Sequence, residues 1–484
     1  MEDKVVRGVP WTLLAYAGSK AIGVLTTLVV AHLLVPKDFG IMAIALMATS
    51  FVSWFGDLGF SRTLVLRQDL DRDGEGTLLS LMLMSSVAAA GVSAALGPLA
   101  ALAFHEPRLT AVLGVLSLVL IPGGLGSYYE ALLEREFEFR RRFVGYGLQA
   151  VVSAAVSIAL AVAGAGVWSL VAGQLAGYGV FALTLFALAP YRVRPRFDRS
   201  LTRGLFGSGM GFLSQGVTDF LRVNADNITV ARVFGSSALG YYSMAFRFGD
   251  LSWTAIAAPA TRVSFSAFTR ARHRGDDICP AVLSSLRLVA LVAIPFGLLL
   301  SGTAEPMTRA LLGSRWLPMV GPLTILGLWA AIRPLDSLLC WVLNSVGLAK
   351  LVSFVSVGVL ALLVPALIVA VQFGRLSAVA LMVTGDITLS LALSTFFVHR
   401  RLGLAVRAIW NAVRPSALAG PPMWLATWAV AHALPKHDAA IAFPAAVVAG
   451  LAVYAAVISL VDRRLLPSAG SQALRMLGRA RAAA

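Results

Sequence analysis

The chain has 484 residues, of which 58% are hydrophobic and only 13% are charged, whereas soluble domains average about 25% charged residues. This composition excludes a soluble enzyme and indicates an all-α polytopic membrane protein, because about 20 apolar residues suffice for one membrane-spanning helix. The formal net charge of +16 then reflects basic loops on the cytoplasmic side of a membrane rather than a nucleic-acid partner.

Apolar runs broken by charged clusters and by Pro or Gly predict about 14 membrane-spanning helices. Six are expected in the first part of the chain, at residues 10–34, 40–61, 77–104, 109–132, 143–163 and 167–189. Six more are expected after a basic connector, at 204–231, 239–261, 281–302, 317–344, 351–372 and 377–398. A last pair is expected at 411–434 and 439–461. The connections are short, so we expect no folded domain outside the membrane.

The distribution of basic residues predicts how these helices are oriented. With the N-terminus in the cytoplasm, the expected inner segments carry about four times as many Lys and Arg residues as the outer loops. We therefore expect both termini in the cytoplasm. We divide the chain into an N-terminal lobe at 1–190, a basic cytoplasmic connector at 191–203, a C-terminal lobe at 204–400, and two extra helices with a basic tail at 401–484.

The two lobes show signs of an internal repeat. At an offset of 200 residues, the stretch 30–45 falls on 230–245, and Gly40 falls on Gly240 just after the expected short loop. The identities are few, and apolar composition alone could produce them. A true repeat would be parallel, because each half starts on the same side of the membrane.

Cysteine and histidine indicate neither a disulfide nor a metal site. The two cysteines, Cys279 and Cys340, form no paired motif, and the six histidines are scattered along the chain. We expect no cofactor beyond a coupling ion. His105 and Glu106 lie together in a short outer loop, and we expect both to be solvated.

Ionisable groups inside membrane spans are costly and usually face a water-filled cavity or a partner. The ionisable and amide side chains that stand out inside the expected spans are Lys20, Asp57, Gln215, Asp219, Arg222, Asn224, Asp226, Arg247, Asp250, Arg333, Asp336 and Asp386. Four of them are spaced by 4, 3 and 4 residues, which places them on one helical face: Gln215, Asp219, Arg222 and Asp226.

Short motifs near the N-terminus identify the chain as similar to a known family. Residues 31–40 read A-H-L-L-V-P-K-D-F-G, residues 57–60 read D-L-G-F, and residues 67–68 read R-Q. This pattern resembles polysaccharide transporters of the multidrug/oligosaccharidyl-lipid/polysaccharide export (MOP) superfamily, although His32 replaces the family's usual Arg. Residues 238–243 are similar to the family's connection between its seventh and eighth helices.

The resemblance implies a flippase for lipopolysaccharide, O-antigen or exopolysaccharide precursors. Such a protein carries undecaprenyl-diphosphate-linked oligosaccharide from the cytoplasmic to the periplasmic leaflet of the bacterial inner membrane by alternating access, without enzymatic chemistry. Two six-helix lobes would enclose a central cavity, and the last two helices would pack outside them. The expected partners are the lipid-linked glycan, membrane lipid, and the glycan polymerase or export machinery.

Two other functions stay open at this point. A multidrug or small-solute antiporter shares the superfamily fold, but it would favour a small apolar or acidic pocket, against which the basic groups argue. A membrane enzyme such as a glycan polymerase or ligase usually needs a large outer loop or an intramembrane His/Asp constellation. The sequence contains neither.

Under the flippase interpretation, the buried charges take two roles. The cations Lys20, Arg222, Arg247 and Arg333, with Gln215 and Asn224 beside them, would hold the diphosphate, since Arg and Lys both suit phosphate oxygens. The alternative is that each Arg–Asp pair is neutralised in place and ties helices together. The acids Asp219, Asp226, Asp250 and Asp386 are candidates for coupling to H⁺ or Na⁺. Asp57 is expected to be a cap or a gate at the end of its helix.

Overall fold

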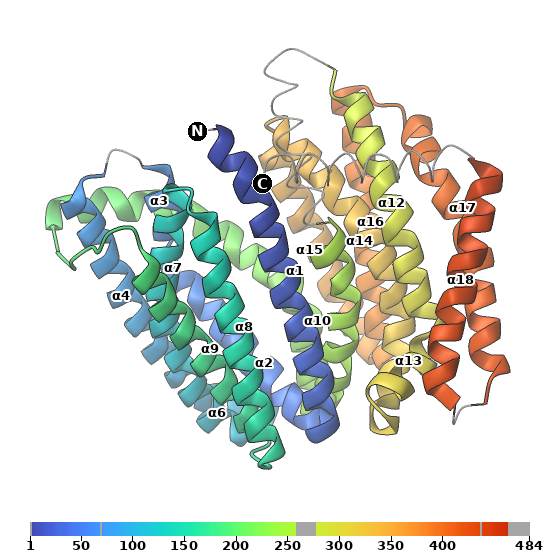
Figure 1. The fold of residues 1–484 in the computed structure, drawn as a ribbon, viewed down its shortest axis with the longest axis horizontal. Helices are drawn as coiled ribbons and strands as arrows, with labels where there is room; N and C mark the ends of the chain where they lie inside the picture. Colours follow the sequence, from blue (N-terminus) through green and yellow to red (C-terminus); the bar gives the residue numbers. More distant parts are fainter. Residues whose placement is uncertain (1, 68–69, 258–276, 436–437, 463–484) are drawn as a thin grey trace. The chain divides into compact units, whose positions relative to one another are not determined.

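A computed structural model describes residues 2–67, 70–257, 277–435 and 438–462, and in them all regular structure is helical (Figure 1). The chain divides into two compact units, the described parts of Met1–Gly240 and of Tyr241–Leu477. This division falls inside a long helix, whereas the boundary at 191–203 between the two lobes stays a prediction.

The first unit is a bundle formed by the first nine helices and most of the tenth. Its elements are α1 (Glu2–Leu33), α2 (Pro36–Asp57), α3 (Phe60–Leu66), α4 (Arg72–Ala95), α5 (Gly97–Phe104), α6 (Arg108–Leu116), η1 (Ser117–Val119), α7 (Leu120–Arg135), α8 (Phe139–Val162), α9 (Val167–Leu188) and α10 (Arg199–Leu251) up to residue 240. In this unit α8 packs closely on α9, because Gly177 of α9 faces Ser153 of α8 and leaves no room for a larger side chain.

The second unit begins with the end of α10. Its further elements are η2 (Ser252–Ala257), α12 (Cys279–Gly302), α13 (Ala304–Leu311), η3 (Ser314–Met319), α14 (Val320–Ser345), α15 (Ala349–Val371), α16 (Leu376–Leu402), α17 (Val406–Ala433) and α18 (Ala439–Val461).

Two chain breaks of the first unit lie 200 residues apart. The first is at Val35, between the end of α1 and Pro36, which occupies the first turn of α2, where its missing N–H costs nothing. The second is inside α10 at Gly235, whose φ of 83° and ψ of 176° interrupt the helix and suit glycine. The loop expected at 232–238 is therefore reduced to this single break.

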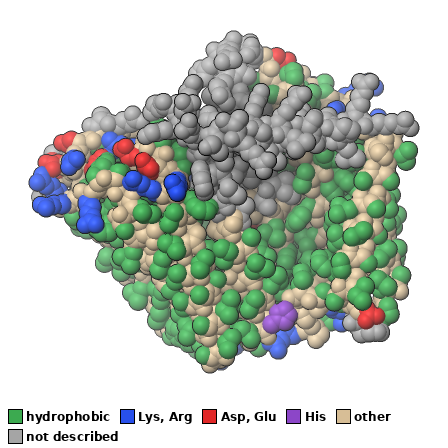
Figure 2. All heavy atoms as spheres, viewed as in Figure 1, with side chains coloured by type: hydrophobic (Ala, Val, Ile, Leu, Met, Phe, Trp, Pro, Cys, Tyr) green, Lys and Arg blue, Asp and Glu red, His purple; other side chains and the backbone are tan. Residues whose placement is uncertain are grey.

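Nine helical segments within the described ranges are long and apolar enough to cross a membrane. They are Arg72–Phe104, Arg108–Arg135, Phe139–Val162, Val167–Leu188, Cys279–Gly302, Ser314–Ser345, Ala349–Val371, Leu376–Leu402 and Ala439–Val461. The total of 14 spans and the cytoplasmic placement of both termini stay predictions. Figure 2 shows hydrophobic side chains along the visible sides of the helices, with charged side chains gathered at the end of the first unit where α3 and α7 end.

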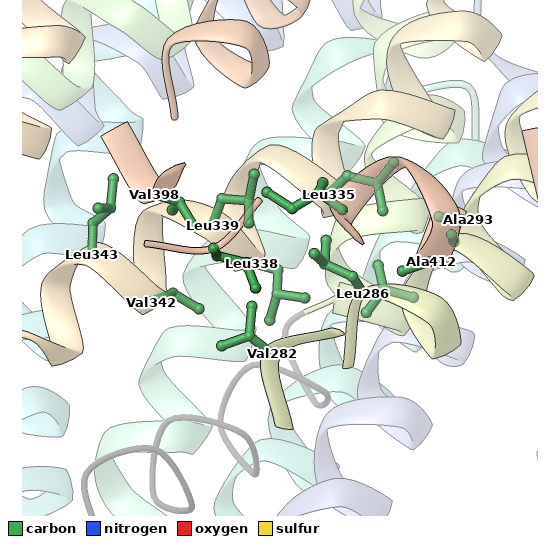
Figure 3. Packing of buried hydrophobic residues seen from close by; sticks show 14 of the residues in the cluster. Val282, Leu286, Ala293, Leu335, Leu338, Leu339, Val342, Leu343, Val398 and Ala412 are labelled. Carbon is green, nitrogen blue, oxygen red and sulfur yellow. The ribbon is translucent and has the colours of Figure 1, made fainter. Parts of the chain in front are cut away.

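The core of the second unit lies between α12, α14, α16 and α17. Buried Leu286 and Val282 of α12 meet Leu338 and Val342 of α14 in one cluster (Figure 3). Further along the same pair of helices, Gly297 and Gly327 face each other. A Cβ at Gly297 would lie 2.4 Å from the Gly327 carbonyl oxygen, and one at Gly327 would lie 2.7 Å from the Gly297 carbonyl oxygen. Small residues let helix backbones approach this closely, and packing of this kind drives helix association in lipid.

The basic connector is fixed to the first unit. The Arg196 N–H donates to the Gly76 carbonyl oxygen (3.2 Å), and the Asp198 N–H donates to Thr77 Oγ1 (3.2 Å). A Cβ at Gly76 would lie 2.6 Å from the Arg194 carbonyl oxygen, so the close approach of the connector to α4 requires glycine there.

Candidate functional site

Asp57 caps a helix, which is one of the two roles expected for it. The D-L-G-F motif ends α2 with two residues in the left-handed region, Leu58 (φ 46°) and Gly59 (φ 75°). Asp57 Oδ1 then accepts from the N–H (3.2 Å) and the hydroxyl (2.6 Å) of Ser61 in α3. A side-chain acceptor satisfies a backbone donor at the start of a helix, so this motif bends the chain and secures the next helix.

Three of the predicted phosphate-binding cations lie within long helices. Lys20 is exposed on α1, Arg222 is partly exposed on α10, and Arg247 is exposed on the last turns of α10. Lys20 and Arg222 belong to the first unit and Arg247 to the second. A charge at bilayer depth is tolerated where it meets water or a polar partner rather than lipid.

Arg333 lies in a polar site of the second unit. Its Nη1 lies 3.7 Å from Oδ2 of Asp336, one turn along α14, and its guanidinium lies over the Trp253 ring of η2. Asp336 is fully buried, and its Oδ1 accepts from the hydroxyls of Ser390 (3.0 Å) and Ser394 (3.1 Å) in α16. This carboxylate ties α14 to α16 and pairs with Arg333, while the binding of diphosphate by Arg333 stays a prediction.

The polar face expected along residues 215–226 is described only in its second half. The side chains of Gln215 and Asp219 lie outside the described residues. Asn224 donates to the Phe220 carbonyl oxygen of its own helix (3.0 Å), and Asp226 is 2% exposed and accepts from the N–H of Asn227 (2.7 Å).

The two other acids predicted for ion coupling lie in the second unit. Asp250 is half-buried at the end of α10, and Asp386 is half-buried on α16, one turn before Ser390. Within the described ranges, no three His, Cys, Asp or Glu side chains form a group that could hold a metal ion.

The expectation that His105 and Glu106 are both solvated is wrong for Glu106. Glu106 is 5% exposed, and its Oε2 lies 2.8 Å from Lys37 Nζ and accepts from the Ser236 hydroxyl (3.1 Å). Its neighbour His105 accepts at Nδ1 from Nη1 of Arg232 (3.0 Å). The short loop between α5 and α6 thus contacts α2 and α10 at once, which its sequence does not reveal because the partners are far along the chain.

The start of α2 and the second part of α10 meet in a reciprocal contact, here called the seam and formed by residues 36–40 and 236–240. A Cβ at Gly40 would lie 1.7 Å from the Ser236 carbonyl oxygen, and a Cβ at Gly240 would lie 1.9 Å from the Pro36 carbonyl oxygen. Position 40 therefore contacts position 236, the equivalent of position 36 at the 200-residue offset, and position 36 contacts position 240, the equivalent of position 40. A pair of contacts exchanged in this way is what a local two-fold relation between repeats produces, and it supports the parallel repeat.

Asp38 is one of the seam residues and lies before the span expected at 40–61. It is buried, and burial raises the pKa of its carboxyl, while the Val35 N–H and the charges of Arg108 and Lys37 oppose the rise. The seam is thus surrounded by ionisable groups on the α2 and α6 side.

Sequence reasoning missed a second buried acid, Glu75, near the start of α4. It is 3% exposed, and its Oε1 lies 2.6 Å from Nη1 of Arg135 and accepts from the Tyr191 hydroxyl (3.1 Å). Burial and the nearby Glu75 charge raise the pKa of Tyr191 to about 12. This site joins α4, the end of α7 and the connector.

A third acid, Glu130 of α7, also escaped the prediction. It accepts from Nη2 of Arg142 (2.6 Å) and from the Tyr146 hydroxyl, both on α8. The signal was present, because Glu130 interrupts an apolar run inside the span expected at 109–132.

The sequence of the chain is similar to those of proteins that take part in polysaccharide biosynthesis. Residues 29–321 match a family described as polysaccharide biosynthesis protein. The chain is 28% identical over 331 residues to the succinoglycan biosynthesis transport protein ExoT of Rhizobium meliloti (strain 1021), covering 66% of each chain, just under two thirds. It is 23% identical over 387 residues to the teichuronic acid biosynthesis protein TuaB of Bacillus subtilis (strain 168), covering 78% of each, and 21% identical over 349 residues to the lipopolysaccharide biosynthesis protein WzxC of Escherichia coli (strain K12), covering 70% of each.

The fold is similar to two kinds of solved transporter. A structure of the lipid II flippase MurJ in an inward closed conformation has a TM-score of 0.79 and 13% identity, covering 94% of this chain and 99% of that one. An inward-facing multidrug resistance MATE transporter of the MOP superfamily has a TM-score of 0.65 and 13% identity, covering 84% and 99%. At these identities the likeness concerns the fold.

Proposed function

Since the chain belongs to the polysaccharide biosynthesis protein family, we propose that it moves an undecaprenyl-diphosphate-linked oligosaccharide across the bacterial inner membrane. The glycan would pass from the cytoplasmic to the periplasmic leaflet by alternating access, and no covalent bond would form or break. The product would then be available to a polymerase or export machinery on the periplasmic side.

One observation carries this proposal. A chain whose family is defined by polysaccharide biosynthesis has, over 94% of its length, the fold of a protein named as a lipid II flippase. The family points to a glycan cargo and the fold points to a lipid carrier. A lipid-linked glycan combines both.

Lys20, Arg222 and Arg247 are the residues that we assign to the diphosphate. The cargo's pyrophosphate carries charge that hydrocarbon cannot solvate, so its crossing needs cations at mid-depth. Guanidinium groups bind phosphate oxygens through paired N–H donors, and an ammonium acts as a compact point charge. Arg333, which pairs with Asp336, belongs to the same proposed set.

Coupling to H⁺ or Na⁺ would use carboxylates within the spans. The described candidates are Asp226, which is buried on α10, and Asp250 and Asp386, which are half-buried on α10 and α16. Exchange of a bound cation for cargo would give the cycle its direction, because a ligand shifts an equilibrium between two conformations by its difference in affinity for them.

A strain from which the gene is deleted tests the proposal. We expect lipid-linked repeat units to accumulate in the cytoplasmic leaflet, surface glycan to be lost, and both to be restored by the intact gene. Lys20→Ala and Arg247→Ala should each fail to restore surface glycan at normal membrane levels. Arg375→Ala is the matched control, since Arg375 is exposed at the start of α16 outside the assigned cations.

Two results would overturn parts of the proposal. Drug hypersensitivity with normal surface glycan in the deletion strain would favour a multidrug antiporter, whose fold this chain also resembles. Full complementation by well-expressed Lys20→Ala and Arg247→Ala would remove the assignment of the cations while leaving the transport function in place.

A further inference from the structure

The seam joins two segments that the repeat makes equivalent. The start of α2 belongs to the first half of the chain, and α10 beyond Gly235 belongs to the second half. If the halves separate at this end during transport, the contacts between residues 36–40 and 236–240 must break. The seam is therefore the place to look for a device that holds this end closed.

Glycine makes the seam close but gives it little strength of its own. At Gly40 and Gly240 the two backbones touch with no Cβ between them. Neither glycine contributes a side chain to this contact. Other side chains near the contact must therefore supply the interaction that holds the closed state.

Glu106 supplies such an interaction from a third element. Its Oε2 is shared between Lys37, next to Pro36 on one side of the seam, and Ser236 on the other side. The Glu106 side chain is therefore buried, since the residue is only 5% exposed. Glutamate is rarely buried unless partners satisfy its carboxylate, as Lys37 and Ser236 do here. One acid thus bridges both halves of the repeat, beside a second link from His105 to Arg232.

We propose that Glu106 is the latch of the seam: it holds the α1–α2 corner against the second half of α10 in the closed state and releases it when the transporter opens to the periplasm. This inference rests on the proposed function for the direction of opening. The latch is a positioning device and does not touch cargo. The Lys37 side chain is 43% exposed, so the ion pair is weak enough to break during a cycle.

Distance measurement across the seam tests the latch directly. Val35 and Val233 are both exposed, at 47% and 53%, and flank the two chain breaks. Spin labels would be attached to V35C and V233C in the full chain carrying C279S and C340S, reconstituted in nanodiscs. Electron–electron double resonance then reports the separation of the two corners without any need for cargo.

We expect the unmodified seam to give a narrow distribution at short distance. Glu106→Gln, which keeps an acceptor for Ser236 but loses the charge that attracts Lys37, should add a longer-distance population. Glu106→Ala should enlarge that population further. Gly40→Ala should shift it most, because the new methyl would overlap the Ser236 carbonyl oxygen.

Gly91→Ala in α4 is the matched control, since nothing lies within 4 Å of a Cβ at that position. It should leave the distribution unchanged, and an equal shift would show that the response is not specific to the seam. If Gly40→Ala does not fold, the two Glu106 variants decide. Unchanged distances in well-folded Glu106→Gln and Glu106→Ala would overturn the latch.

The result is separable from the fate of the proposed function. A deletion strain with normal glycan export would reject the cargo, while the spin-label distances would still decide whether Glu106 holds the seam. Conversely, unchanged distances combined with lost export in the deletion strain would reject the latch and leave the transport function supported.

Discussion

Among the residues that the structure describes, two reciprocal glycine contacts differ in what surrounds them. Gly297 and Gly327 join α12 and α14 along the side of the apolar core of the second unit. Gly40 and Gly240 join α2 and α10 beside Glu106, Lys37 and Ser236. The close approach of α12 and α14 is thus accompanied by apolar packing, which is lost if these helices part. The close approach of α2 and α10 is accompanied by polar contacts, which water can replace. We infer that the first contact is permanent and the second can open.

The largest expected effect is on the permanent contact. Gly297→Ala places a methyl 2.4 Å from the Gly327 carbonyl oxygen, and overpacking of a tight interface costs about 1–3 kcal/mol. We expect a clearly lower thermal unfolding midpoint in nanodiscs and a lower membrane level. Gly385→Ala on α16, where a Cβ meets nothing within 4 Å, should leave both unchanged.

Gly40→Ala sharpens the comparison, because its overlap with Ser236 is even closer. If the seam can open, the strain is relieved by separation, and the unfolding midpoint should fall less than in Gly297→Ala despite the shorter distance. Both variants would be measured in the same nanodiscs. An equal or larger fall for Gly40→Ala would show that the seam is as permanent as the α12–α14 contact.

Asp336→Ala tests whether the hydrogen bonds between α14 and α16 are needed for stability. It leaves the hydroxyls of Ser390 and Ser394 without their buried acceptor, and an unsatisfied buried polar group costs about 1–3 kcal/mol. We expect a lower unfolding midpoint, with partial recovery in Asp336→Asn, whose side-chain oxygen still accepts. A midpoint unchanged in Asp336→Ala would mean that α14 and α16 do not depend on this tie.

Glu106→Gln should have a smaller effect on stability than any of these variants. Ion pairs with an exposed partner contribute about 0–1 kcal/mol, and Lys37 is such a partner. We expect an unfolding midpoint close to that of the parent protein together with altered glycan export. A large loss of stability would indicate a structural role for Glu106 instead of a latch.

The smallest expected effect concerns pH at the seam. Burial raises the pKa of Asp38 above its ordinary value of 3.8. The Asp38 carboxylate therefore binds a proton more readily in the folded chain than in the unfolded chain. The associated stability is present at low pH and is lost as pH rises through the raised pKa. Thermal unfolding of Asp38→Asn as a function of pH should lack this component, and identical profiles for the two proteins would contradict it.

The sequence predicted features whose cause is local. The cap at Asp57 follows from an acid placed before two residues with left-handed backbone and a Ser four positions on. The break near Gly235 follows from the short polar interruption between two apolar runs. The single-face spacing of residues 215–226 is likewise a local property, and the structure describes only part of it.

Features that depend on distant partners could not be predicted in the same way. The burial of Glu106 requires Lys37 and Ser236, which are 69 and 130 positions away in the chain, and a hydrophilic loop looks solvated until such partners are known. The hydrogen bonds of Asp336 likewise depend on Ser390 and Ser394, which lie on another helix. Glu130 is different, because an acid inside an apolar run was visible and the rule on intramembrane charge should have selected it.

The anchored connector sets how movement passes through the chain. Its last bonded residue, Asp198, immediately precedes Arg199, the first residue of α10. Because the connector is hydrogen-bonded up to its last residue, it has no free residues that could extend when α10 moves. Each free residue would add about 3.3 Å to the distance that the connector can span. Any tilt of α10 must therefore pull on the start of α4 or break the hydrogen bonds of the connector to Gly76 and Thr77. Lengthening the chain between 198 and 199 with flexible residues would uncouple the two helices without changing any residue that we propose to bind cargo.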